Sequence, residues 1–397
     1  MGSIEHVNSG QIDEGANASA FELGHQPALD GLRGIAILVV MAFNGHMLWM
    51  QGGFVGVDIF FVLSGFLITS ILVQGYQRNA SIGLKDFYVR RALRLLPALF
   101  VLVLFCIGYA LFLQPADKAV DTLKGVLYTI FYVANWAQVP PNPPGIGPLS
   151  HAWSLSVEEQ FYIIWPLLLM GLLKLKNKGL VLAILSTLIA VSVICSIWLW
   201  YAKVSYFRMY FGSDTRAHEL LIGCVASLLM SWGVFHRLTR LGWAFHLASV
   251  ISLAGILLSL FLVRYNAAFV YNGGFTLICL GTALLILDLV LFPSVLSRGF
   301  EFRPLVWIGK ISYGLYLWHY PIFEASRRFF EGRMNPVFFE VIGVGGTFLA
   351  ATASYYLLER PFLRLKRRFD TAASLLSPPS QTIENPMNLG SIGADHR

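Results

Sequence analysis

The stretch LDGLRGIA at residues 29–36, together with GGFVGVDIFFVLSGFLIT at residues 52–69, decides how this chain folds. Each stretch opens or contains a long apolar run, and each carries an ionisable side chain, Arg33 in the first and Asp58 in the second. A helix needs about 20 apolar residues to cross a bilayer. Ionisable side chains inside such spans are costly and are typical of functional sites. The two stretches therefore predict two membrane helices that carry functional residues.

The composition of the whole chain extends this prediction. Of 397 residues, 56% are hydrophobic and only 13% are charged. Unbroken apolar runs favour helices over a barrel, because only these two architectures satisfy the backbone inside lipid. We therefore predict an all-α polytopic membrane protein in a bacterial cell membrane. The net charge of +7 is more typical of basic cytoplasmic loops than of nucleic-acid binding. The four cysteines show no metal-ligand spacing, so no metal site is expected.

Hydropathy predicts about ten transmembrane helices. They are expected at residues 33–50, 56–76, 95–113, 153–173, 179–200, 216–235, 243–263, 270–292, 305–325 and 337–357. A weaker run at residues 122–137 is predicted to lie on or re-enter the outer face, because a crossing there would abolish the excess of Lys and Arg on one side. Both termini are then cytoplasmic. The domains follow as a disordered tail (1–28), a membrane domain (29–369) and a second disordered tail (370–397).

The first predicted helix carries polar residues at two levels. Helical rise places Asn44 roughly 16 Å above Arg33, and His46 roughly 20 Å above it. Arg33 is either an anchor on the cytoplasmic side or a functional group, and the flanking glycines favour a close approach by a ligand. His46 is either an interfacial residue or part of a site with Asn44.

A basic cluster at helical spacing, Arg90, Arg91 and Arg94, precedes the third predicted span, and Arg90 and Arg94 would share one helix face. Guanidinium groups bind phosphate in a two-pronged geometry. The cluster is expected to bind either a cytoplasmic phosphate ligand such as coenzyme A or lipid head groups.

The segment HAWSLSVEEQFY opens the fourth predicted helix with His151, Trp153, Glu158 and Glu159. Adjacent helical residues point about 100° apart. One carboxylate could therefore face a polar interior while the other meets a neighbouring helix, and a structural ion pair with an arginine is the simpler alternative.

Later polar residues are candidate substrate contacts. Asp214 and Arg216 open the sixth predicted helix, and Asp214 could instead cap it. Tyr313 and Tyr316 in the ninth either line a cavity or pack, and His319 follows near the outer end.

Taken together, seven segments resemble the acyltransferase 3 family of integral membrane O-acyltransferases over about residues 29–369. They are LDGLRGIA, GGFVGVDIFFVLSGFLIT, FYVRRALRLLP, HAWSLSVEEQFYIIWP, DTRAHELLIGC, ISYGLYLWHYPI and ERPFLRLKRR. The resemblance implies transfer of an acyl group, often acetyl, from cytoplasmic acyl-CoA to a hydroxyl of a glycan, a lipid-linked sugar or a macrolide-type acceptor. Acyl-CoA would be a co-substrate, with no tightly bound cofactor. The chain is expected to be a stand-alone form without a fused esterase-like domain, and a homodimer is allowed for.

The resemblance also assigns roles. Arg90, Arg91 and Arg94 would hold the nucleotide end of coenzyme A, and Glu158 or Glu159 would orient or charge-stabilise the base while Arg33 supports the inner cavity. The family's essential histidine falls at Asn44, where an amide cannot take a proton.

Three explanations for Asn44 stay open: an inactive form made to trap substrate, a base supplied by His46, or a natural non-catalytic member. A transporter or flippase of a lipid-linked sugar and a binding-only protein remain the alternative functions.

Overall fold

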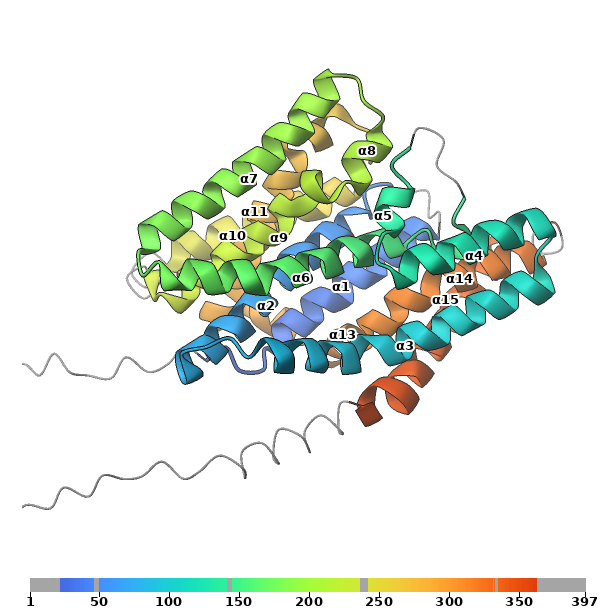
Figure 1. Ribbon diagram of the computed structural model, residues 1–397, viewed down its shortest axis with the longest axis horizontal. Coiled ribbons are helices and arrows are strands. Elements are labelled where there is room, and N and C mark those ends of the chain that lie inside the picture. Colours follow the sequence, from blue (N-terminus) through green and yellow to red (C-terminus); the bar gives the residue numbers. More distant parts are fainter. Residues whose placement is uncertain are drawn as a thin grey trace, which may run out of the picture.

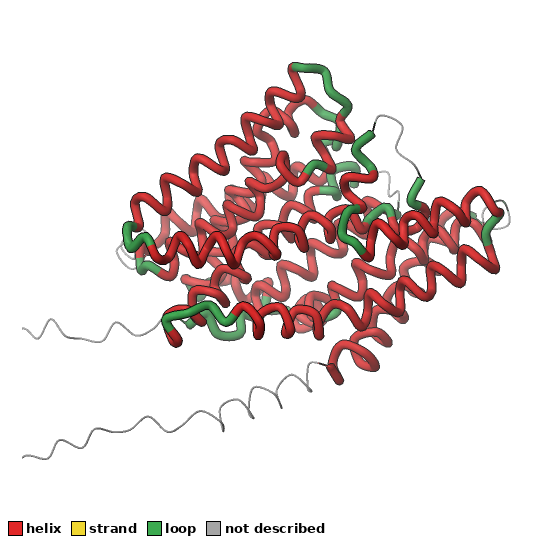
Figure 2. Tube along the Cα trace, in the orientation of Figure 1, coloured by secondary structure: helices red, strands yellow, loops and turns green. Residues whose placement is uncertain are grey.

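The computed structural model describes residues 22–45, 50–140, 145–235, 242–330, 332 and 335–362. Within these residues all regular structure is helical, as Figure 2 shows. The all-α fold class is therefore confirmed. The two predicted tails lie almost wholly outside the described residues, although α1 already begins at Pro27, inside the tail predicted for residues 1–28.

The helices form a bundle whose long members run roughly side by side (Figure 1). In chain order they are α1 (Pro27–Asn44), α2 (Val55–Asn79), α3 (Leu84–Leu113), α4 (Ala116–Ile130), α5 (Ala134–Ala137), η1 (Gly147–Leu149), α6 (Ala152–Lys174), α7 (Lys178–Tyr201), α8 (Tyr206–Phe211), α9 (Ser213–Ser231), α10 (Gly242–Leu262), η3 (Val270–Gly274), α11 (Phe275–Leu291), α12 (Val295–Phe300), α13 (Arg303–Lys310), α14 (Ser312–Phe330), α15 (Pro336–Ser354) and η4 (Tyr355–Glu359).

Seven helical segments of the described chain are long and apolar enough to cross a membrane by themselves. They are α1, α2, α3, α7, α10, α11 extended back to Val270, and a segment from Glu340 to Phe362. Three other predicted spans fall on α6, α9 and α14, which are helical but carry the ionisable residues singled out above. Whether these three also cross stays a prediction.

Two predicted spans differ in extent from the helices that contain them. Helix α3 begins at Leu84, ahead of the span predicted at residues 95–113, and continues through Pro97, so the arginine cluster lies on this helix, as its helical spacing predicted. The span predicted at residues 305–325 is two helices, α13 and α14, which meet at Ile311. Hydropathy averages over such breaks and does not register them.

The weak run at residues 122–137 becomes α4, which folds back along α3, followed by the short α5 next to the start of α6. In Figure 1, α4 covers only one end of the bundle. At 15 residues α4 is not among the helices long enough to cross, and its place on the outer face stays a prediction.

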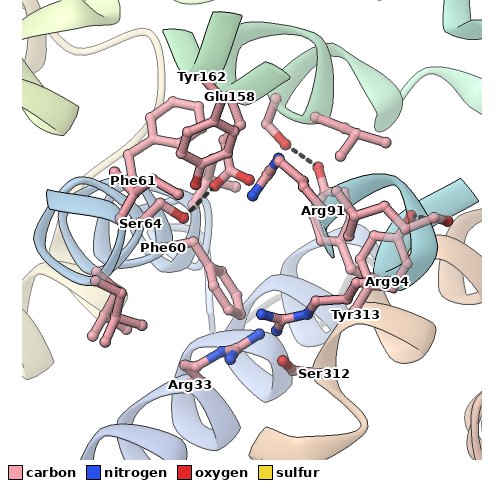
Figure 3. A pocket seen from close by; sticks show the side chains of 18 of the residues that line it. Arg33, Phe60, Phe61, Ser64, Arg91, Arg94, Glu158, Tyr162, Ser312 and Tyr313 are labelled. Carbon is pink, nitrogen blue, oxygen red and sulfur yellow. Dashed lines mark hydrogen bonds between the residues drawn. The ribbon is translucent and has the colours of Figure 1, made fainter. Parts of the chain in front are cut away.

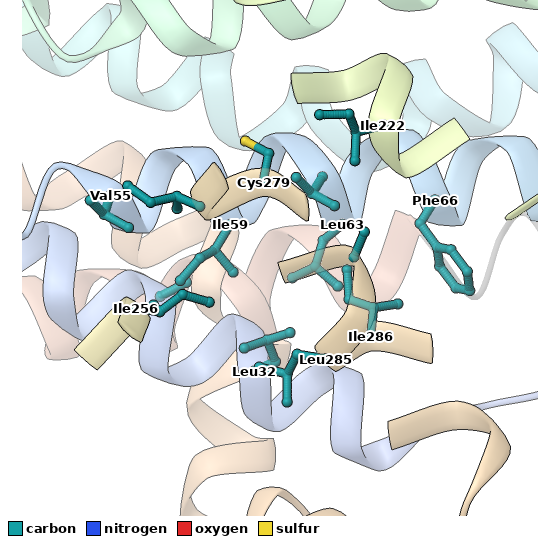
Figure 4. Close-up of a cluster of buried hydrophobic side chains, with 14 of the residues drawn as sticks. Leu32, Val55, Ile59, Leu63, Phe66, Ile222, Ile256, Cys279, Leu285 and Ile286 are labelled. Atoms are coloured by element: carbon teal, nitrogen blue, oxygen red, sulfur yellow. The ribbon is translucent and has the colours of Figure 1, made fainter. Parts of the chain in front are cut away.

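The core lies where α1, α2, α9, α10 and α11 meet, as Figure 4 shows. Its closest contact joins α2 and α9. A Cβ atom on Gly65 would lie 2.0 Å from the Leu220 carbonyl oxygen, and one on Gly223 would lie 2.1 Å from that of Val62. Glycines allow helix backbones to approach this closely in a membrane. This contact fixes α2, which carries part of the site.

Candidate active site

An inner cavity of about 140 Å³ lies among α1, α2, α3, α6 and α14. Figure 3 shows its polar residues. The polar side chains that line it are Arg33, Ser64, Arg91, Arg94, Ser154, Glu158, Tyr162, Ser312, Tyr313 and Tyr316. The remaining wall is apolar and comes chiefly from α2. A narrow cavity with a few convergent polar groups is typical of a ligand site.

Two guanidinium groups point toward each other at one end of this cavity. Figure 3 shows Arg33 of α1 and Arg94 of α3 converging beside Ser312. Arg94 is exposed, so the cavity is accessible at this end. Two facing cations repel each other. The buried carboxylate of Glu359 offsets part of this repulsion, and an anion placed between the two guanidinium groups would offset more of it. The arrangement therefore suits a phosphate or another anionic group.

The two adjacent glutamates of α6 face different partners, as their 100° separation predicts. Glu158 faces the cavity and accepts a hydrogen bond of 2.9 Å from Ser64. Glu159 is buried and binds Arg91 through a forked ion pair, whose Nε contacts are 3.0 and 3.1 Å. The Arg91 guanidinium also lies 3.5 Å from the centre of the Tyr162 ring. Arg91 is therefore held by protein groups, and Arg94 is the cluster member that is freer to meet a ligand.

A second, outer cavity of about 390 Å³ lies near the end of α1. Aromatic rings dominate its wall, with contributions from Phe43, Phe54, Trp153, Tyr206, Phe207, Tyr210, Phe211, Tyr265, Tyr316 and Tyr320. Its polar groups include Asn44, Gln138, Ser150 and His151. Flat rings with a few hydrogen-bonding groups suit a polyhydroxylated ligand whose faces are partly apolar.

Asn44 pairs with a buried histidine. Its Nδ2 lies 3.0 Å from Nε2 of His319, which is fully buried. The other ring nitrogen, Nδ1, lies 2.7 Å from the carbonyl oxygen of Tyr316 and 3.2 Å from that of Leu315. Because carbonyl oxygens only accept, Nδ1 carries the proton and Nε2 accepts from the Asn44 amide. His319 is thus an acceptor aimed at position 44.

His151 stands beside this pair. It lines the outer cavity and is only 4% exposed, and neither ring nitrogen makes a hydrogen bond of good geometry, although backbone oxygens of Pro148 and Leu317 lie close by. Its ring centre lies 5.1 Å from that of His319. A buried polar group without a partner is costly, so a ligand hydroxyl in the cavity would relieve this deficit.

The two cavities meet at Val57 and Tyr316, which line both. The Tyr316 hydroxyl donates to the carbonyl oxygen of His151 at 2.6 Å and also contacts the hydroxyl of Ser154. A donor that enters the inner cavity and an acceptor that enters the outer one would therefore meet at this tyrosine.

Other predicted residues lie away from both cavities. Asp58 and Arg216 are fully buried in an ion pair, which Glu219 joins at 2.9 Å from Arg216. The Arg216 guanidinium stacks on Phe275, 3.9 Å from the ring centre. This packing favours a structural role over the predicted substrate contact.

Asp214 is likewise occupied. It accepts two hydrogen bonds from Arg208, at 2.7 and 2.6 Å, and this pairing raises the pKa of Arg208. Tyr313 does line the inner cavity, where its hydroxyl donates to the Leu95 carbonyl oxygen at 3.0 Å. His46 lies outside the described residues.

Sequence reasoning missed Ser64, Ser154 and the aromatic wall from α8. Serine and aromatic residues are common in membrane helices, and no spacing marks them as functional. Only the rotation of α2 and α6 about their axes decides that Ser64 and Ser154 face the cavity.

The described residues thus form an all-helical bundle of the polytopic membrane class, in which two chemically different cavities share Val57 and Tyr316. The sequence profile of the family described as "Acyltransferase domain" matches residues 26–356, so the chain belongs to this acyltransferase family. This confirms the resemblance noted from the sequence.

Relatives of the chain carry O-acetyltransferase names. It is 38% identical over 349 residues to the peptidoglycan O-acetyltransferase OatA of Listeria monocytogenes, covering 84% of this chain and 55% of that protein. It is 35% identical over 368 residues to the O-acetyltransferase OatA of Staphylococcus aureus (strain MRSA252), covering 89% of this chain and 60% of that protein. The chain thus spans little more than half the length of these relatives. No solved structure matches it.

Proposed function

We propose that this protein is a membrane O-acetyltransferase that transfers an acetyl group from acetyl-CoA to a hydroxyl of a glycan of the peptidoglycan type. The observation that carries the proposal is the meeting of two chemically different cavities at Tyr316. Family membership and the names of the relatives supply the reaction class. A macrolide acceptor has no such support.

The inner cavity suits the donor. The facing guanidinium groups of Arg33 and Arg94 match the diphosphate of coenzyme A. Ser312 lies beside them, four residues before Tyr316 on α14, which is about 6 Å along the helix. A long, uncharged arm could extend over this distance through the apolar part of the cavity and bring its thioester to the boundary.

The outer cavity suits the acceptor. Sugar rings have apolar faces and hydroxyl edges, and its wall offers Trp153 and Tyr210 for the faces. His151 and Asn44 offer polar atoms for a hydroxyl. The acceptor hydroxyl would then lie on the far side of Tyr316 from the thioester.

The reaction needs a base for that hydroxyl. In the direct mechanism the base takes the proton, the hydroxyl oxygen bonds to the thioester carbonyl carbon, and the carbon–sulfur bond breaks. The thiolate leaves and receives the proton. By exchanging its present acceptor, the carbonyl oxygen of His151, for the thioester carbonyl oxygen, the Tyr316 hydroxyl would donate to that oxygen as negative charge develops on it. A covalent acyl-enzyme remains the alternative.

Position 44 is where this chain departs from the expected chemistry. Its amide occupies the place from which an imidazole would face both His319 and the outer cavity. We propose that the chain is a weakly active or inactive form, and that Asn44→His supplies the missing base. His151 is the nearest described imidazole on the cavity wall and is the second candidate.

The test measures label transfer. The protein and its Asn44→His form are placed in lipid nanodiscs with [14C]acetyl-CoA and a soluble peptidoglycan oligosaccharide. We expect label in the glycan, released by mild base as expected of an ester, and much faster in the Asn44→His form. Failure of both forms to label the glycan or to hydrolyse acetyl-CoA would refute the enzyme and favour a transporter or a binding protein.

A further inference from the structure

A second recess is lined by one face of α13. It has a volume of about 470 Å³ and lies among the start of α1, α13 and η4. We call it the α13 groove. Its charged and large aromatic residues include Glu301, Arg303, Trp307, Lys310, Tyr356 and Arg360.

The charges in the α13 groove favour an anion. Arg303, Lys310 and Arg360 supply three cations against the single carboxylate of Glu301. These three cations have no carboxylate partner among the ion pairs of the described chain. Cations that converge without a carboxylate partner are typical of a phosphate site.

The aromatic residues add a flat ring surface. Trp307 is 38% exposed and Tyr356 is 43% exposed, so both rings are accessible. The Arg360 guanidinium lies 5.6 Å from the centre of the Tyr356 ring. Aromatic rings beside cations are the usual combination for a nucleobase attached to phosphate.

The groove has a rigid wall. A Cβ atom on Gly309 would lie 1.8 Å from the Asp30 carbonyl oxygen, and one on Gly34 would lie 2.4 Å from the Leu305 carbonyl oxygen. Two glycines thus hold the backbones of α1 and α13 in direct contact. The side chains of Arg303, Trp307 and Lys310 therefore project from a fixed helix.

Residues of the groove and of the inner cavity are also near neighbours along the chain. Pro27 in the groove and Arg33 in the cavity lie six residues apart on α1, about 9 Å along its axis. Lys310 in the groove is two residues from Ser312 in the cavity. A single ligand could occupy both places, with phosphates at each.

We propose that the α13 groove binds the adenosine 3′-phosphate end of the acyl-CoA donor, while Arg33 and Arg94 bind its diphosphate. The inference rests on the proposed function and deepens it. It moves the nucleotide site from the α3 arginine cluster, where Arg91 is already paired with Glu159, to the junction of α1, α13 and η4. The 3′-phosphate meets Arg303, Lys310 and Arg360, and the adenine stacks on Trp307, with Tyr356 on the same wall.

The test compares two ligands that differ by one phosphate. Binding of coenzyme A and of dephospho-coenzyme A, which lacks the 3′-phosphate, is measured by calorimetry on the full chain in phosphatidylcholine nanodiscs. In Arg303→Gln/Lys310→Gln, we expect affinity for coenzyme A to fall 10- to 100-fold, as for lost hydrogen bonds between charged groups. Affinity for dephospho-coenzyme A should change less than threefold. Trp307→Leu should instead weaken both ligands equally, by roughly tenfold.

Lys174→Gln is the matched control, since Lys174 is exposed at the end of α6 and lines neither the groove nor the inner cavity. It should leave both affinities unchanged. In the opposite outcome, the double variant still binds coenzyme A, with the same ratio of affinities for coenzyme A and dephospho-coenzyme A as the original chain. That result would overturn the groove assignment and leave the proposed function standing.

Two further outcomes are decisive. If the original chain binds neither ligand, the acyl-CoA donor is wrong and the proposed function falls with the groove. The same phosphate chemistry could also serve an anionic lipid. If the double variant keeps its affinity for coenzyme A but no longer retains phosphatidylglycerol through purification, the groove is a lipid site and the proposal is overturned.

Discussion

The hydrogen bond between position 44 and His319 makes a quantitative prediction about catalysis. The perturbation is His319→Leu, introduced into the Asn44→His form. Nε2 of His319 can only accept, because Nδ1 donates to the carbonyl oxygens of Tyr316 and Leu315. A histidine at position 44 would therefore donate one ring N–H to His319 and keep its other nitrogen free to act as the base.

The size of the effect follows from the charge on that bond. When the histidine at position 44 takes the acceptor's proton it becomes an imidazolium, and its bond to His319 becomes charge-assisted. The present amide makes the corresponding contact at 3.0 Å. Hydrogen bonds to charged groups contribute about 1.5–3 kcal/mol, so we expect kcat to fall roughly 10- to 150-fold. KM should stay within about twofold, because His319 is fully buried and lines neither cavity.

The assay is the initial rate of glycan acetylation from labelled acetyl-CoA, with the melting temperature measured on the same samples. Ser326→Ala, on the same helix and also buried, is the control and should not alter kcat. An unchanged kcat in a His319→Leu protein that melts at the same temperature would refute the reasoning. A fall in kcat matched by a large rise in KM would also contradict it.

Three other changes test the fold and the acceptor site. Gly65→Val forces a side chain against a backbone oxygen of α9 and should destabilise the fold by about 1–3 kcal/mol or more. The effect is measured as a lower melting temperature in detergent. Gly75→Val is the control, because a side chain there meets nothing within 4 Å, and it should leave the melting temperature unchanged. Asp58→Leu removes one carboxylate partner of Arg216 in a fully buried cluster and should lower the free energy of unfolding by about 3–5 kcal/mol. Asp58→Asn should lower the melting temperature less in the same assay. If Asp58→Leu is as stable as the original chain, Asp58 has no structural role. Trp153→Leu should raise KM for the glycan roughly two- to tenfold while acetyl-CoA hydrolysis stays unchanged, and a rise in KM for acetyl-CoA would place Trp153 on the donor side instead.

Much of the fold and part of the site could be predicted from the sequence. The apolar runs predicted the helical class, and the spacing of Glu158 and Glu159 predicted that they face different surroundings. Asn44, His151, Trp153 and Tyr313 do line the cavities. Asp58, Arg216 and Asp214 were equally conspicuous by charge, yet their partners lie within the protein. A charge in an apolar run marks a polar interaction, but it does not identify the partner.

By itself the sequence determined that the chain forms membrane helices, since a backbone in lipid must satisfy its own hydrogen bonds. It also determined the height of each polar group along its helix, because the rise per residue is fixed. The tertiary structure alone decided which of those groups share a cavity. That choice depends on how each helix is rotated about its axis. Close packing between segments distant in sequence sets this rotation, as in the contacts of Gly65 with α9 and of Gly309 with α1.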